Sequence, residues 1–230
     1  MMSNHDTLAS SVYVSRRFQR STKLDSDIGE TGSLDGFILQ RSCEDCLQLM
    51  ARYFTETSQR AFTWTGSYGS GKSTLALFLC SLLDAGTYLH EVAVGILDAE
   101  PERTNLIRKA FVPASPYRLI TMTGHNGNLD EDFRNVVSPD SATARDAISA
   151  IVKEARSLAQ GGIIIVIDEL GKYLEGGNSN NCYFLQELAE SVNRSNAPII
   201  VLGILHQAFD AYAQKITKSQ RDEWAKVQGR

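Results

Sequence analysis

The sequence contains no apolar run that approaches the ~20 residues needed to cross a bilayer. Its first residues, MMSNHDTLASSVYVSRR, lack the basic start and the apolar stretch of a secretory signal peptide. Both absences argue against a membrane-spanning or secreted protein. We therefore expect a cytoplasmic protein with no membrane partner.

Cysteine and excess positive charge are also scarce. The 230 residues include four cysteines and carry a formal net charge of −4, which disfavours a disulfide scaffold and a strongly basic nucleic-acid surface. Cys43 and Cys46 form a C-x-x-C, but a zinc ribbon needs a second pair, and Cys80 and Cys182 stand far apart. We expect free thiols, and the charge indicates no nucleic-acid partner beyond a local patch such as 15-SRRFQR-20.

What the sequence does contain is a glycine-rich segment between two hydrophobic elements, 61-AFTWTGSYGSGKSTLALFLCSLL-83. Its centre fits G-x-x-x-x-G-K-[ST], the pattern of a phosphate-binding P-loop, and its flanks read as a strand and a leucine-rich helix. Backbone N–H groups of such a loop surround a phosphate, and the positive end of the helix points at the same place. The sequence therefore predicts an ATP site. The predicted nucleotide-binding residues are Gly66, Ser67, Tyr68, Gly69, Ser70, Gly71, Lys72, Ser73 and Thr74.

Two acids follow a run of five aliphatic residues in 163-IIIVIDE-169. Such a run is typical of a strand buried on both faces of a parallel sheet, and ligands bind at the carboxyl ends of such strands. We predict that Asp168 and Ser73 hold Mg²⁺, that Lys72 reaches the β- and γ-phosphates, and that Glu169 positions the attacking water. These three roles together constitute a phosphoryl-transfer site.

A second apolar run, Ile199 to Leu205, ends at His206. A polar side chain at the end of a strand beside the Asp168 strand could contact the γ-phosphate. His206 is therefore a candidate catalytic sensor, and a histidine that merely ends a strand is the alternative.

The remaining pattern predicts an α/β P-loop fold, with a mostly parallel sheet, helices on both faces, and the additional strand and catalytic glutamate of one ATPase class. Residues 1–41 read as an irregular lead-in and residues 42–230 as the ATPase domain, incomplete at its C-terminus. A helix from about Ser42 to Glu56 is expected before the P-loop, and a helix over Cys182–Asn193 after the two acids. The elements expected between the two motifs are a strand at Val92–Leu97, a helix near Glu102–Phe111, a strand at Arg118–Thr121, a loop over 123–133 and a helix capped by Ser141.

Two further strings would suit a circularly permuted GTPase. Asp168 to Gly171 matches D-x-x-G, and 22-TKLD-25 matches the guanine-selecting [NT]-K-x-D. The guanine motif should follow a buried strand, and 15-SRRFQRS-21 is not such a strand. We rank this alternative below an ATPase.

Two other classes remain open. A small-molecule kinase would need residues 126–138 as its lid, where Arg134 is the single arginine available. A nucleotide-gated binding switch would keep every motif residue and differ from an ATPase only in its rate of turnover.

Several blocks together resemble large bacterial P-loop ATPases of the AAA+/STAND-like kind, including the ATPases of BREX-type anti-phage defence systems. The blocks are WTGSYGSGKST, IIIVIDELGKYLE, FLQELAE, VLGILHQAFDAYA and RDEWAKVQGR. The resemblance implies ATP, Mg²⁺, self-association or assembly with other defence subunits, and a role in phage defence.

The same resemblance implies that the chain is the N-terminal ATPase portion of a longer protein, or the product of a truncated gene, and that it stops before the lid. An arginine finger would then be Arg221, Arg230 or a residue of another subunit, so we expect feeble hydrolysis by the isolated chain. An uncovered sheet edge would favour self-association.

Overall fold

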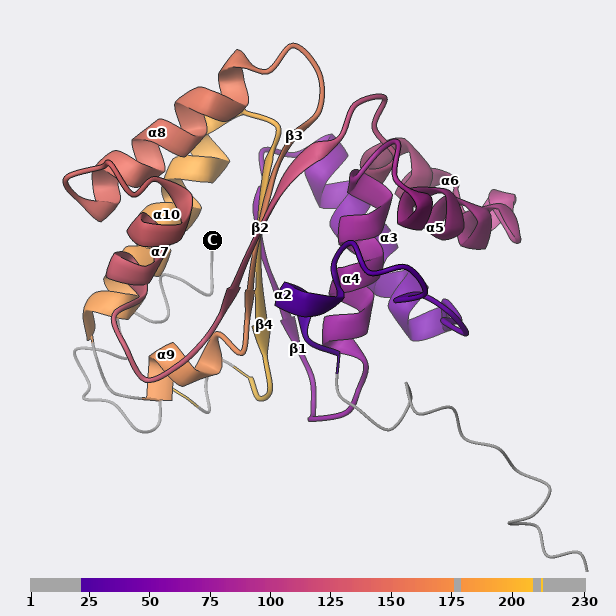
Figure 1. The fold of residues 1–230 in the computed structure, drawn as a ribbon, viewed down its shortest axis with the longest axis horizontal. Coiled ribbons are helices and arrows are strands. Elements are labelled where there is room, and N and C mark those ends of the chain that lie inside the picture. The colour runs from indigo at the N-terminus through magenta and orange to yellow at the C-terminus, as the bar shows by residue number, and fades with distance from the viewer. Residues whose placement is uncertain (1–21, 176–178, 209–211, 213–230) are drawn as a thin grey trace, which may run out of the picture.

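The computed structural model describes residues 22–175, 179–208 and 212. Its centre is a four-stranded sheet in the order β1-β4-β3-β2, in which every neighbouring pair is parallel. The strands are β1 (Ala61–Thr65), β2 (Tyr117–Thr123), β3 (Gly162–Asp168) and β4 (Ile199–Leu205). Helices cover both faces (Figure 1), so the predicted α/β architecture is confirmed.

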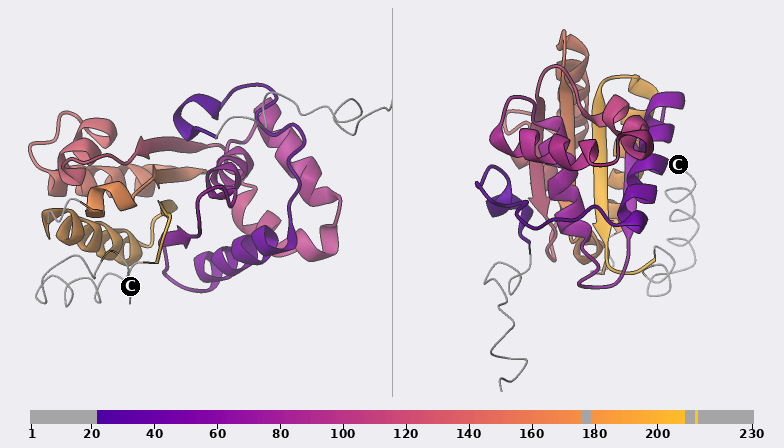
Figure 2. Two further views of the ribbon diagram at one scale, coloured as in Figure 1. Left: turned by 90° about the horizontal axis from the view of Figure 1, so that it is seen from below. Right: turned by 90° about the vertical axis from the view of Figure 1, so that its right-hand side faces the viewer.

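The helices form one layer on each side of the sheet (Figures 1 and 2). One layer contains α2 (Leu24–Asp27), α3 (Arg41–Glu56), α4 (Lys72–Leu83), α5 (Tyr88–Asp98) and α6 (Pro101–Phe111). The other contains α7 (Leu129–Val137), α8 (Ala144–Ser157), α9 (Gly171–Glu175) and α10 (Ser179–Ser195).

The two central strands explain why the sheet takes this form. Every residue of β3 and of β4 is buried, because each strand has a neighbour on both edges and a helical layer on both faces. Alternate side chains enter opposite cores: Ile164 and Val166 pack on the α4 side, whereas Ile163 and Ile165 pack on the α8 side. In the sheet, β4 separates β1 from β3.

Three sequence-based assignments are wrong. The apolar run Val92–Leu97 is part of helix α5, because Thr87 caps the helix at the N–H of His90 and Leu89, Ala93 and Leu97 are buried at four-residue spacing. The loop expected over 123–133 gives way to α7 from Leu129.

The third concerns the start of α8. Ser141 does not cap this helix; Thr143 does, in a capping box with Asp146 in which each side chain bonds the other residue's backbone N–H. Ser141 instead donates to the hydroxyl of Ser138.

The lead-in is more ordered than its composition suggests. From Thr22 onward it forms α2 and a series of turns, and Leu24 and Leu34 are each 2% exposed within the α4-side core. Within the described residues no single helix has the length and hydrophobicity needed to cross a bilayer, although α4 and α5, bent by 105°, pass that test as a pair.

Candidate functional site

The P-loop connects β1 to α4 at the carboxyl end of the sheet. The N–H of Gly66 donates to the carbonyl of Leu205 at 3.2 Å, which extends the β1–β4 pairing by one residue and fixes where the loop begins. Gly69 and Gly71 have φ of +74° and +82°, conformations that glycine adopts without steric cost. Gly71 is also the residue that precedes α4, so the loop turns directly into the helix N-terminus.

Lys72 folds back over this loop. Its ammonium group donates to the carbonyl oxygens of Gly66 at 2.6 Å and Ser67 at 2.8 Å, and to the hydroxyl of Ser70 at 3.3 Å. Partial burial lowers the pKa of Lys72, and the nearby negative charge of Asp168 opposes that shift. The lysine and the acid predicted from separate motifs therefore lie within electrostatic reach of each other.

Asp168 ends β3 with 7% of its surface exposed. Its Oδ1 atom accepts a hydrogen bond from the N–H of Glu169 at 2.8 Å. Among the described residues its other oxygen accepts none, so one carboxylate oxygen remains for a ligand. Because Ile164 and Val166 of β3 pack on the α4 side, alternation places Asp168 on that side too, where Ser73 lies in the first turn of α4.

Glu169 has a left-handed backbone with φ of +51°, an uncommon conformation for a residue with a side chain. Its carboxylate forms an ion pair with Lys172, one turn further along. Strain of this kind, about 1–3 kcal/mol, persists where the surroundings fix the residue and often marks functional sites.

The fixing neighbour is Gly124, which sequence reasoning did not single out. Its N–H donates to the carbonyl of Asp168 at 2.7 Å, and a Cβ at this position would lie 2.1 Å from the carbonyl oxygen of Glu169. Only a glycine lets the loop after β2 lie this close to the backbone of Glu169. A lone glycine after a predicted strand was the only sequence signal available.

His206 lies just beyond β4 with its ring stacked on that of Tyr68, with ring centroids 3.7 Å apart and planes inclined by 17°. Both ring nitrogens are buried and without a hydrogen-bond partner among the described residues. Burial lowers the pKa of His206, and the charge of Lys72 adds to that shift. A buried ring nitrogen usually has a partner, and the N–H of a neutral His206 ring is available to donate to a ligand oxygen.

The side chains assembled here fit a magnesium–nucleotide complex. Mg²⁺ in P-loop sites takes a hydroxyl, an acid and phosphate oxygens, and it keeps several waters. Ser73 carries a hydroxyl and Asp168 an acid of the kinds that such a site would use. Within the described residues no three His, Cys, Asp or Glu side chains gather as a metal cluster, and the donor set proposed here does not require one.

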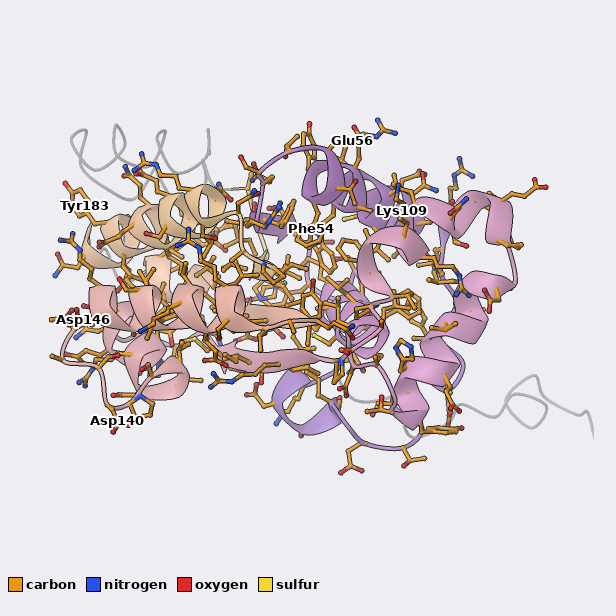
Figure 3. All side chains as sticks on the ribbon, turned by 90° about the horizontal axis from the view of Figure 1, so that it is seen from above. Phe54, Glu56, Lys109, Asp140, Asp146 and Tyr183 are labelled. Carbon is orange, nitrogen blue, oxygen red and sulfur yellow. The ribbon has the colours of Figure 1, made fainter. Side chains whose placement is uncertain are left out.

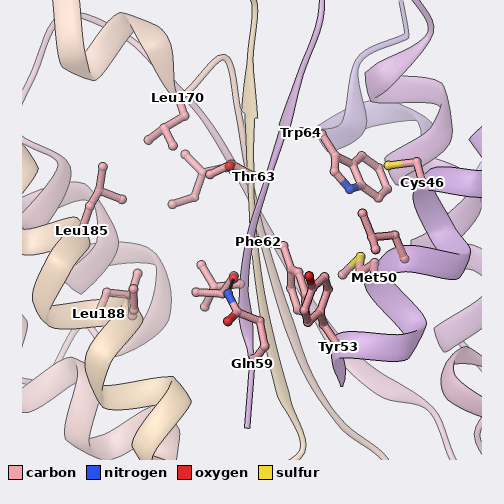
Figure 4. A pocket seen from close by; sticks show the side chains of 16 residues that line it. Cys46, Met50, Tyr53, Gln59, Phe62, Thr63, Trp64, Leu170, Leu185 and Leu188 are labelled. Atoms are coloured by element: carbon pink, nitrogen blue, oxygen red, sulfur yellow. Dashed lines mark hydrogen bonds between the residues drawn. The ribbon is translucent and has the colours of Figure 1, made fainter. Parts of the chain in front are cut away.

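A large apolar pocket of about 510 Å³ lies elsewhere, at the outer edge of β1 (Figure 4). Within the described residues β1 has a neighbour only on its β4 side, so its other edge is unpaired. The pocket extends to both faces of this edge, between Leu49, Met50 and Tyr53 of α3 and Leu185 and Leu188 of α10. Its lining carries little charge, so it does not suit a phosphate.

Two alternatives fit this geometry poorly. The segment proposed as a kinase lid contains α7, whose Leu129 and Phe133 are fully buried, and Arg134 bonds Ser141 and Asn135. In the 22-TKLD-25 string, Leu24 is buried and Asp25 accepts a hydrogen bond from Thr123, so the string forms no pocket for a guanine base.

Several predicted features lie outside the described residues. They are the 15-SRRFQR-20 patch, the RDEWAKVQGR block and the two arginine-finger candidates, Arg221 and Arg230. The four cysteines, all within the described residues, form no disulfide with one another, as expected.

Neither a family model nor a curated protein matches this sequence. Among solved structures, the chain is similar to Rhizobiales Trip13, with 13% sequence identity and a TM-score of 0.40 over 83% of this chain. The match covers 60% of the Trip13 chain, so this chain spans about three fifths of that length.

Proposed function

We propose that this chain binds ATP with Mg²⁺ and hydrolyses it slowly. The observation that carries the proposal is the meeting of Lys72, Asp168 and Glu169 at one end of the sheet, around a P-loop that opens directly into a helix N-terminus. Lys72 and the loop amides would hold the phosphates. Ser73 and Asp168 would hold Mg²⁺, which neutralises charge on the β- and γ-phosphates when bound.

The remaining side chains suggest the course of the reaction. The Glu169 carboxylate would accept a proton from a water whose oxygen attacks the γ-phosphorus, and the bond to the β–γ bridging oxygen would break to release ADP. The ring N–H of His206, whose nitrogens have no hydrogen-bond partner within residues 22–175, 179–208 and 212, would donate to a γ-phosphate oxygen. Glu169 must leave its ion pair with Lys172 to act as a base, which favours slow turnover.

A single-turnover measurement tests the reaction. Enzyme in excess over radiolabelled ATP should release phosphate, and Glu169→Gln should abolish the release while retaining ATP binding. Equal rates for the wild type and Glu169→Gln would remove Glu169 from the proposed mechanism.

The same proposal includes the assembly and the biological role. The edge of β1 that pairs with no other described strand supports self-association. The sequence blocks that resemble BREX-type ATPases support a role in phage defence, and loss of protection from infection in a Lys72→Ala strain would be the expected phenotype.

A further inference from the structure

The segment before α3 lies against the side of the site where the proposed metal ligands stand. The hydroxyls of Thr22 and Thr74 are 2.8 Å apart, and Thr74 directly follows Ser73. The Oδ2 atom of Asp25 accepts a hydrogen bond of 2.7 Å from the hydroxyl of Thr123. The segment is therefore attached beside both proposed metal ligands, because Thr123 is the register partner of Asp168.

The sheet's alternation places these groups on one face. Odd residues of β2 such as Tyr117 and even residues of β3 such as Val166 pack on the α4 side. By the same alternation Thr123 and Asp168 point to that side, where α4 begins with Lys72 and Ser73. Helix α2 packs against both α4 and β2, as Figures 1 and 2 show.

The position of α2 does not depend on Asp25. Leu24 is buried in the core, the N–H of Lys23 donates to Asp27 at 2.9 Å, and the hydroxyl of Ser33 donates to the carbonyl of Asp27 at 2.7 Å. The exposed Asp25 carboxylate is thus held in place by a scaffold that would remain if its charge were removed.

Mg²⁺ bound to a nucleotide keeps several waters, and their protons need acceptors. Carboxylates outside the ligand set commonly orient such ligands, and their loss costs about 10–100-fold in metal affinity. One Asp25 oxygen is engaged by Thr123, and among the described residues the other accepts no hydrogen bond. Resting on the proposed function, we propose that Asp25 is a positioning residue whose carboxylate accepts a hydrogen bond from the hydration shell of nucleotide-bound Mg²⁺.

The test is a Mg²⁺ titration of nucleotide binding by the full chain, followed with a ribose-labelled fluorescent ATP analogue. Asp25→Asn retains an oxygen for Thr123 and removes the charge. The matched control is Asp140→Asn, an exposed acid between α7 and α8 in the opposite layer (Figure 3). Thr123→Val keeps the β-branched shape of the strand and releases the Asp25 carboxylate, so it tests orientation separately from charge.

We expect the half-saturating Mg²⁺ concentration to rise about tenfold in Asp25→Asn, at the lower end of the range because the carboxylate is exposed. Thr123→Val should also raise the half-saturating Mg²⁺ concentration, and Asp140→Asn should leave it unchanged. Binding in EDTA should not weaken in Asp25→Asn, because one fewer negative charge faces the phosphates.

Three results would overturn this inference. The first is an unchanged Mg²⁺ requirement in Asp25→Asn while Lys72→Ala still fails to bind nucleotide. This result would exclude a role for Asp25 at the Mg²⁺ hydration shell and would leave the proposed function intact. Equal weakening with and without Mg²⁺ would indicate a purely structural role. Absence of nucleotide binding by the wild type would refute both proposals.

Discussion

Gly124 gives the most direct test of how the site is held in shape. A Cβ added there would lie 2.1 Å from the carbonyl oxygen of Glu169 and 2.7 Å from its carbonyl carbon, and both are backbone atoms that no side-chain rotation can move. Overpacking of this kind costs about 1–3 kcal/mol. Gly124→Ala should therefore lower the free energy of unfolding by about 2 kcal/mol and displace Glu169.

Gly95 provides a matched control for the same chemical change. It lies within α5, is exposed, and an added Cβ would meet nothing within 4 Å. Alanine in a helix interior is more stabilising than glycine by about 0.5–1 kcal/mol, so Gly95→Ala should raise the free energy of unfolding.

The assay is urea unfolding followed by circular dichroism. With an m-value of about 3 kcal/mol/M, a loss of 2 kcal/mol lowers the midpoint by about 0.7 M. Gly124→Ala should also slow single-turnover phosphate release, whereas Gly95→Ala should leave it unchanged. A Gly124→Ala variant as stable and as active as the wild type would refute the close approach on which the site depends.

Three other predictions follow from groups outside the site. Arg60 is 9% exposed and donates to the carbonyls of Phe54, Thr57, Gln59 and Ala197 near the amino end of β1, so Arg60→Ala should cost about 2–3 kcal/mol in urea unfolding while ATP affinity stays unchanged. Burial raises the pKa of Cys80 from its ordinary 9 to about 12, so the thiol ionises at lower pH in the unfolded chain than in the folded one. The free energy of unfolding should therefore fall as the pH rises from 9 towards 12. Cys80→Ala should reduce that fall, and an equal fall in both proteins would contradict the raised pKa. Leu49 and Tyr53 line the apolar pocket beside β1 and are 52% and 47% exposed. Replacing both with lysine should reduce self-association measured by sedimentation velocity, and an unchanged distribution would place the contact elsewhere.

The elements that sequence reasoning found are those whose signal is local. The P-loop is defined by glycines and a lysine at fixed spacing. Strands β3 and β4 are continuous aliphatic runs, as expected of a strand that helices cover on both faces. The elements it missed depend on distant contacts. The residues of α5 include VAVGIL, which reads as a strand until the Thr87 cap and the packing of α5 on α4 decide for a helix.

The same distinction applies within the site. The position of Asp168 and Glu169 at the end of β3 could be predicted from the aliphatic run that precedes them, and their catalytic roles stay predictions. The role of Gly124 depends on the carbonyl of Glu169, which is distant in sequence, and the role proposed for Asp25 depends on Thr123. Neither partner could be identified from spacing alone.

We propose that Lys72, Ser73 and Asp168 form an ATP site. The most direct test is equilibrium binding of ATP and GTP with Mg²⁺, measured side by side on the wild type, Lys72→Ala and Glu169→Gln. We predict that ATP binds more tightly than GTP, that Lys72→Ala abolishes binding, and that Glu169→Gln preserves it. Tighter binding of GTP, or unchanged binding by Lys72→Ala, would contradict the account.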